Sequence, residues 1–63
     1  MTIIGYRKGA NSYNAILSVK KHTGRSLLES KRLIERVLEG ETVWLDEDFV
    51  LREELTDLKF IVK

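Results

Sequence analysis

The side chains with the clearest chemical potential are one histidine and a run of three carboxylates. His22 is the only histidine of the 63-residue chain, and no carboxylate stands near it in the sequence to orient its ring. We therefore interpret it as a solvated residue at a helix end and not as a general base. Asp46, Glu47 and Asp48 are consecutive, unlike the alternating ligands of a calcium loop. Their position predicts the start of a helix, where negative charge complements the helix dipole.

Other arrangements that could support catalysis are missing. The stretch from Gly5 to Gly9 has too few glycines for a phosphate loop and lacks its Gly-Lys-Ser/Thr ending. There is no cysteine, so a thiolate nucleophile, a disulfide and a thiolate metal site are all excluded. No serine stands in a nucleophile-elbow context. We expect a binding protein and not an enzyme, with no catalytic residue, no metal and no cofactor.

The size and composition predict a single domain over residues 1–63. A chain of this length buries only about 60% of its unfolded surface, but with 43% apolar residues a small core is expected. No charged and then apolar leader is present, and the apolar runs are too short to cross or anchor to a membrane. We expect a cytoplasmic protein, either a monomer or a weak homodimer.

The net charge of +1 conceals two halves of opposite sign. Residues 1–36 carry eight Lys and Arg against two Glu, and residues 37–63 carry three Lys and Arg against eight carboxylates. Two interpretations are open. The halves neutralise each other within the fold, or the basic half presents a positive face to an acidic partner.

The apolar periodicity, together with capping residues and glycines at the ends of elements, predicts the order β-α-α-β-α-β. This is an α+β fold with three helices on one face of a small three-stranded antiparallel sheet. Asn11 or Ser12 can cap a first helix that ends near His22, and Gly24 supplies a left-handed residue after it. The remaining elements are a helix with a Ser26/Glu29 capping box that ends before Gly40, a strand over 41–45, a short helix from the acidic run to about Leu55, and strands over 2–7 and 58–63.

The first helix carries two apolar stripes where a surface helix usually has one. One stripe is Ala15 and Val19, and the other, at i, i+3, i+4 and i+7, comprises Tyr13, Ile16, Leu17 and Lys20. Such a helix is either enclosed on two sides or exposes a patch to a partner.

The run from residue 11 to residue 35, NSYNAILSVKKHTGRSLLESKRLIE, resembles the C-terminal domain of the bacterial large-subunit ribosomal stalk protein. The match is free of gaps, and the family's residues align with Ile16, Val19-Lys20, Thr23-Gly24, Leu27 to Lys31 and Leu33-Ile34-Glu35. The predicted order of elements agrees with that family's fold. The family's N-terminal dimerisation domain and hinge are absent, so the resemblance implies a free-standing relative that acts as a regulator or mimic.

In that family the surface of the helical hairpin docks on translational GTPases. Carried across, the resemblance implies a partner-binding surface made of Tyr13, Ile16, Leu17, Lys20, Leu27, Leu28 and Lys31. Leu17 and Leu28 stand where the family has lysine, and Tyr13 stands where it has a smaller valine. This hairpin has therefore exchanged positive charge for apolar contact.

Three functions remain in competition. The leading one is a protein-binding module whose hairpin docks on a translation factor or a related machine. The second is an adaptor or inhibitor that uses the same fold on an unrelated protein. Nucleic-acid binding is the least favoured, because among the basic residues the only interleaved aromatic is Tyr13.

The same alignment predicts burial. We expect Val19, Leu33, Ile34 and Phe60 in the core, Leu17 and Leu28 exposed, and Gly24 at positive φ.

Overall fold

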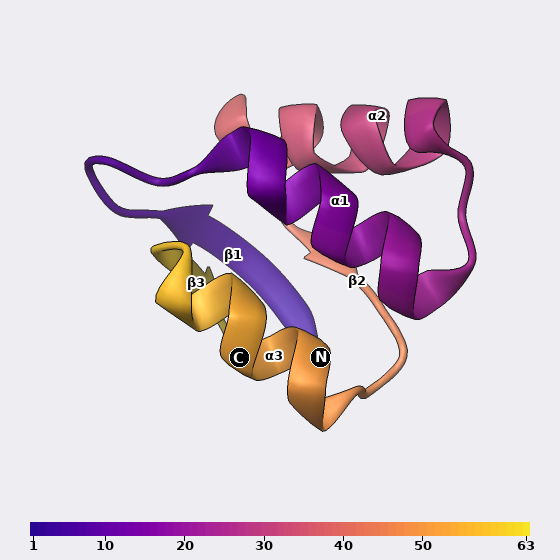
Figure 1. Cartoon of the computed structure of the whole chain (residues 1–63). Coiled ribbons are helices and arrows are strands. Elements are labelled where there is room, and N and C mark those ends of the chain that lie inside the picture. Colours follow the sequence, from indigo (N-terminus) through magenta and orange to yellow (C-terminus); the bar gives the residue numbers. More distant parts are fainter.

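Three helices and a three-stranded sheet make up the chain, and the computed structural model describes all 63 residues. The elements are β1 (Thr2–Tyr6), α1 (Ser12–Thr23), α2 (Leu27–Leu38), β2 (Val43–Trp44), α3 (Phe49–Asp57) and β3 (Phe60–Val62) (Figure 1). This order confirms the predicted α+β fold. Each strand is shorter than predicted.

The first two helices begin where side chains cap them. Asn11, and not Ser12, is the N-cap of α1, and its side-chain oxygen accepts a 3.1 Å hydrogen bond from the Asn14 N–H. At the start of α2 the predicted capping box is present, because Ser26 and Glu29 each accept a 3.1 Å bond from the other's backbone N–H. These bonds satisfy amides that have no partner within the helix.

The third helix is longer than the sequence suggested. It runs to Asp57, two residues beyond the predicted end near Leu55. Thr56 does not break it, because its hydroxyl donates a 2.8 Å hydrogen bond to a carbonyl one turn back. The chain reverses only at Lys59, which adopts φ +72°, and the last strand consequently begins at Phe60.

The sheet has the order β2-β1-β3, so the first strand of the chain lies at its centre. Both pairings are antiparallel, and Ile3 faces Val43 on one side and Val62 on the other. The register between β1 and β3 shifts between Ile3 and Gly5, which leaves Ile4 as an extra residue in a bulge.

One face of the sheet packs against the helices and the other is open. Ile3 and Val43 are buried, while their neighbours Ile4 and Trp44 are exposed, as expected for side chains that alternate between the two faces. The core between sheet and helices comprises Met1, Ile3, Ala15, Val19, Ile34, Val37, Val43, Leu45, Leu51, Leu55 and Phe60.

The predicted burial is confirmed except at one position. Val19, Ile34 and Phe60 are buried, and Leu17 and Leu28 are exposed. Leu33 is only half-buried, because it lies at the margin of the core on the side of α2 that borders β2.

Candidate docking surface on the helical hairpin

The turn between α1 and α2 determines the shape of the hairpin. Three residues, Gly24 to Ser26, connect the helices, which pack side by side in opposite directions (Figure 1). Gly24 adopts φ +74°, as predicted, and its N–H bonds the Lys20 carbonyl. Thr23 supports the turn, since its hydroxyl donates a 2.6 Å hydrogen bond to the Val19 carbonyl. A short, capped turn of this kind leaves the two helices little freedom to separate.

The outer face of α1 carries the predicted apolar stripe. Tyr13 is 68% exposed and Leu17 is 39% exposed, whereas Ile16 is half-buried and contacts the core. Ala15 and Val19, on the opposite side of the helix, are fully buried. The two stripes therefore have different environments. Tyr13 and Leu17 face outward as predicted, whereas Ile16 packs against the core and faces outward only in part.

The face of α2 is divided. Leu27 and Lys31 are exposed and lie one turn apart on the same side of the helix. Leu28 is 55% exposed, and it precedes buried Val37 by nine residues, which is half a rotation of an α-helix after two full turns. Leu28 consequently points directly away from the core.

The predicted residues form an elongated surface and not one compact cluster. Because the helices are antiparallel, the start of α2 lies beside the end of α1. Leu27 and Leu28 are therefore at one end of the hairpin, near the last turn of α1, and Tyr13 is at the other end. Ile16, Leu17 and Lys20 lie between them. We call these residues, with Lys31, the docking surface.

The positive charge of the hairpin is largely unneutralised. Arg36 is the one hairpin Lys or Arg with an ion pair, to Glu41 at 3.2 Å. No carboxylate lies within 4.0 Å of the charged groups of Lys20, Lys21, Arg25, Lys31 and Arg32. The contacts that do form, Arg36 with Glu41 and His22 with Asp48 and Glu54, join the basic half of the chain to the acidic half, so the halves neutralise each other in part.

His22 is not the solvated residue that we expected. Its side chain is only 15% exposed, and it lies between Asp48 and Glu54. Nδ1 is 3.8 Å from Oδ2 of Asp48, and Nε2 is 3.1 Å from Oε2 of Glu54. The second contact is short, but its geometry is not that of a hydrogen bond. The prediction failed because both carboxylates are distant in sequence and reach His22 only when α3 packs on α1.

These contacts connect α1 to α3 and its N-cap, and their order differs from that of a nucleophilic triad. The Ser18 hydroxyl, and secondly His22, hold the pKa of the Glu54 carboxyl below its ordinary value of 4.5. Asp48 is the N-cap of α3, and its Oδ1 accepts a 3.0 Å hydrogen bond from the Leu51 N–H. In a nucleophilic triad the histidine contacts the hydroxyl and the carboxylate supports the histidine, whereas here Ser18 and His22 both act on the carboxylate. We call Ser18, His22, Asp48 and Glu54 the His22 junction.

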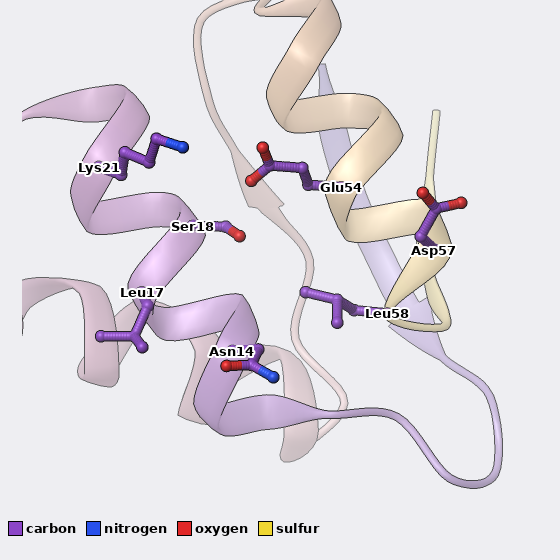
Figure 2. Close-up of a pocket in the computed structure, with 7 residues that line it drawn as sticks. All are labelled: Asn14, Leu17, Ser18, Lys21, Glu54, Asp57 and Leu58. Atoms are coloured by element: carbon purple, nitrogen blue, oxygen red, sulfur yellow. The ribbon is translucent and has the colours of Figure 1, made fainter.

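A groove of about 360 Å³ runs beside this junction, between α1 and α3. Figure 2 shows Ser18 and Lys21 directed from α1 towards Glu54, and Leu58 projecting into the groove from beyond the end of α3. Leu17 borders the groove with its side chain directed away from α3. The groove therefore adjoins the docking surface along α1, and Leu17 belongs to both.

Sequence reasoning missed the exposed apolar side chains outside the hairpin, of which Ile4 and Tyr6 lie on β1 and three more lie around the start of α3. Trp44, Phe49 and Val50 are all exposed, and they flank the acidic run that starts α3. The signal for Trp44 was its position next to Val43 in a strand with one buried face. Phe49 and Val50 precede buried Leu51 at the start of the helix, and no signal in the sequence separates their environments from its own.

Comparison with family models, curated proteins and solved structures finds no match to this chain. No helix has both the length and the apolar character needed to span a membrane.

Proposed function

We propose that this chain is a non-enzymatic protein-binding module whose hairpin docks on a protein through the docking surface. The observation that carries the proposal is the exposure of large apolar side chains, Tyr13, Leu17 and Leu28, on a rigid pair of helices. Apolar and aromatic anchors at the centre of an interface usually provide most of its affinity, and charges at the rim mainly affect the rate of association. Lys20 and Lys31 are placed to serve as such rim charges.

The resemblance to the ribosomal stalk domain favours a translational GTPase as the partner. Because Leu17 and Leu28 replace lysines of that family, apolar contact would contribute more, and charge less, than in the stalk protein. The chain would then act as a regulator or mimic that occupies the factor's stalk-binding site.

The test is binding of the purified chain to a purified bacterial translational GTPase, measured by calorimetry. Tyr13→Ala and Leu17→Ala should each weaken binding by more than about 1 kcal/mol without unfolding the domain, since neither residue fills the core. Val50→Ala is the matched control, because Val50 is an exposed apolar residue outside the hairpin, and it should bind as the wild type does. Lys20→Ala should slow association and reduce its dependence on salt.

Two results would contradict the proposal in different ways. Binding that is lost in charge reversals of the hairpin but unaffected by the Tyr13 and Leu17 variants would exclude apolar docking. Absence of binding to any translational GTPase, together with a hairpin-dependent complex on another protein, would favour the adaptor or inhibitor.

A further inference from the structure

A second groove lies beside α2, on the side of the helix opposite Leu27 and Lys31. Its volume is about 370 Å³, and it lies between α2 and β2. The residues that line it include Arg25, Glu29, Arg32, Leu33, Arg36 and Trp44. We call it the arginine groove. Residues 29, 32, 33 and 36 form one helical stripe at i, i+3, i+4 and i+7. Leu27 and Lys31 lie about half a rotation away on the same helix. Leu28 lies one turn before Arg32, so the docking surface and the groove adjoin at Leu28.

Positive charge dominates this groove. Three arginines line it against one glutamate, and that glutamate is engaged with the Ser26 N–H in the capping box. Arg25 and Arg32 have no ion pair. Arg36 contacts Glu41 in a pair that is exposed to solvent on both sides, so a stronger anion can compete for it.

The groove also contains an aromatic residue, Trp44, which is distant in sequence from the basic residues. Trp44 is 67% exposed, although most of the surface of a tryptophan is usually buried in a folded protein. It lies eight residues after Arg36 and nineteen after Arg25 in the chain, and the packing of β2 beside α2 places it with them. Trp44 projects from the edge strand, on the sheet face opposite Val43, and lines the rim of the groove that the three arginines also line. Its exposed indole offers a stacking surface at the same groove as these phosphate-binding donors.

We propose that the arginine groove binds single-stranded nucleic acid, with a base stacked on Trp44 and phosphates held by Arg25, Arg32 and Arg36. Guanidinium groups bind phosphate in a bidentate manner, and stacking on an aromatic ring tolerates any base. The site is therefore expected to bind without strong sequence preference.

An acidic peptide added as a strand to the sheet edge is the main competitor. Strand addition draws its affinity from backbone hydrogen bonds along the edge. β2 is an edge strand of only two residues, Val43 and Trp44, so it offers a peptide few backbone groups. Stacking on one ring has no such requirement, and the geometry favours the nucleic acid.

Trp44 is the only tryptophan of the chain, so its fluorescence reports on this groove alone. A 12-nucleotide oligouridylate should quench the emission in a saturable manner. The logarithm of the association constant should fall with the logarithm of salt concentration, with a slope of about −2 for three phosphate contacts. Arg32→Gln should reduce that slope by about 0.7.

Anisotropy of a labelled oligouridylate tests the variants that lack the tryptophan. Trp44→Leu should weaken binding roughly tenfold, with the fold verified by circular dichroism. Phe49→Leu is the matched control, since Phe49 is an equally exposed aromatic outside the groove, and it should bind like the wild type.

Three outcomes would overturn the proposal. The first is the absence of quenching, or equal binding by the Trp44 and Phe49 variants. The second is displacement of the oligonucleotide by polyglutamate at equal charge concentration, which would indicate an acidic protein. The third is binding of uridine monophosphate as tight as that of the 12-mer, which would indicate a nucleotide site and not a strand site.

Discussion

The hairpin and the His22 junction differ in how far apart along the chain their residues lie. The docking surface is drawn from one continuous segment, and its turn depends on Gly24 and on a capping box within three residues. The junction joins Ser18 and His22 to Asp48 and Glu54. In the sequence these two pairs are separated by the whole of α2 and β2. Local preferences therefore account for the first region, and only the packing of α3 on α1 accounts for the second.

The two regions also differ in how their charges are used. At the junction two carboxylates surround the one histidine, whereas five cations of the hairpin have no internal partner. The junction thus joins two helices through polar side chains, and these hairpin cations have no carboxylate within 4.0 Å. Mutations in the junction should therefore change stability, and mutations on the docking surface should change binding.

The largest effect on stability is expected at the centre of the junction. His22→Ala should lower the free energy of unfolding by about 2 kcal/mol, because it removes a largely buried side chain and leaves two carboxylates without their shared partner. Denaturant unfolding measures the change. Tyr13→Ala, an exposed position on the same helix, should change it by less than about 0.5 kcal/mol. Equal losses in the two variants would remove the distinction between the regions.

The hairpin turn should be the next most sensitive position. Gly24→Ala should cost about 1 kcal/mol, because a β-carbon disfavours the positive φ found there. Apart from Gly24 itself and its two chain neighbours, no atom lies within 4 Å of the position that the β-carbon would occupy, so backbone strain determines the cost. A melting temperature unchanged from the wild type would show that the turn relaxes to another conformation.

The end of α3 offers the opposite experiment. Lys59 adopts a φ of +72° close to that of Gly24, but with a side chain that disfavours it. Lys59→Gly should therefore raise the free energy of unfolding, by up to about 1 kcal/mol. The greater flexibility of glycine in the unfolded chain destabilises the folded state and reduces this gain. Thermal unfolding of Lys59→Gly, compared with Lys63→Gly as a control at an exposed position of the same residue type, tests it. A loss of stability would mean that contacts of the lysine with the Gly9 loop outweigh the strain.

The smallest effect is the dependence of the junction on pH. Since the pKa of Glu54 is below its ordinary value of 4.5 in the folded protein, its charge stabilises the fold above that pH. The contribution is lost as the pH falls through the lowered pKa. The stability difference between wild type and Glu54→Gln should therefore shrink on acidification, measured by urea unfolding from pH 7 to pH 3. The side chain is 34% exposed, so solvent screening keeps the effect small.

The helices and strands could be predicted well from the sequence, but the contacts between them could not. Caps at Asn11 and Ser26 and the glycine at position 24 act within a few residues, so their consequences could be derived before the structure was known. The environments of His22 and Trp44 depend on residues far along the chain. Periodicity assigns a residue to a face of its own helix or strand, but it does not identify the element that covers that face.

The central position of β1 has a consequence for synthesis of the chain. The strand is made first, but its neighbours β2 and β3 lie more than thirty-five residues later. During translation the hairpin can form before either edge of the sheet exists, because its contacts are local. Its inner face, with Ala15, Val19, Ile34 and Val37, is then only partly covered until α3 and the two edge strands have been made. We expect the nascent chain to be most prone to aggregation at this stage, while the apolar inner face of the hairpin is exposed.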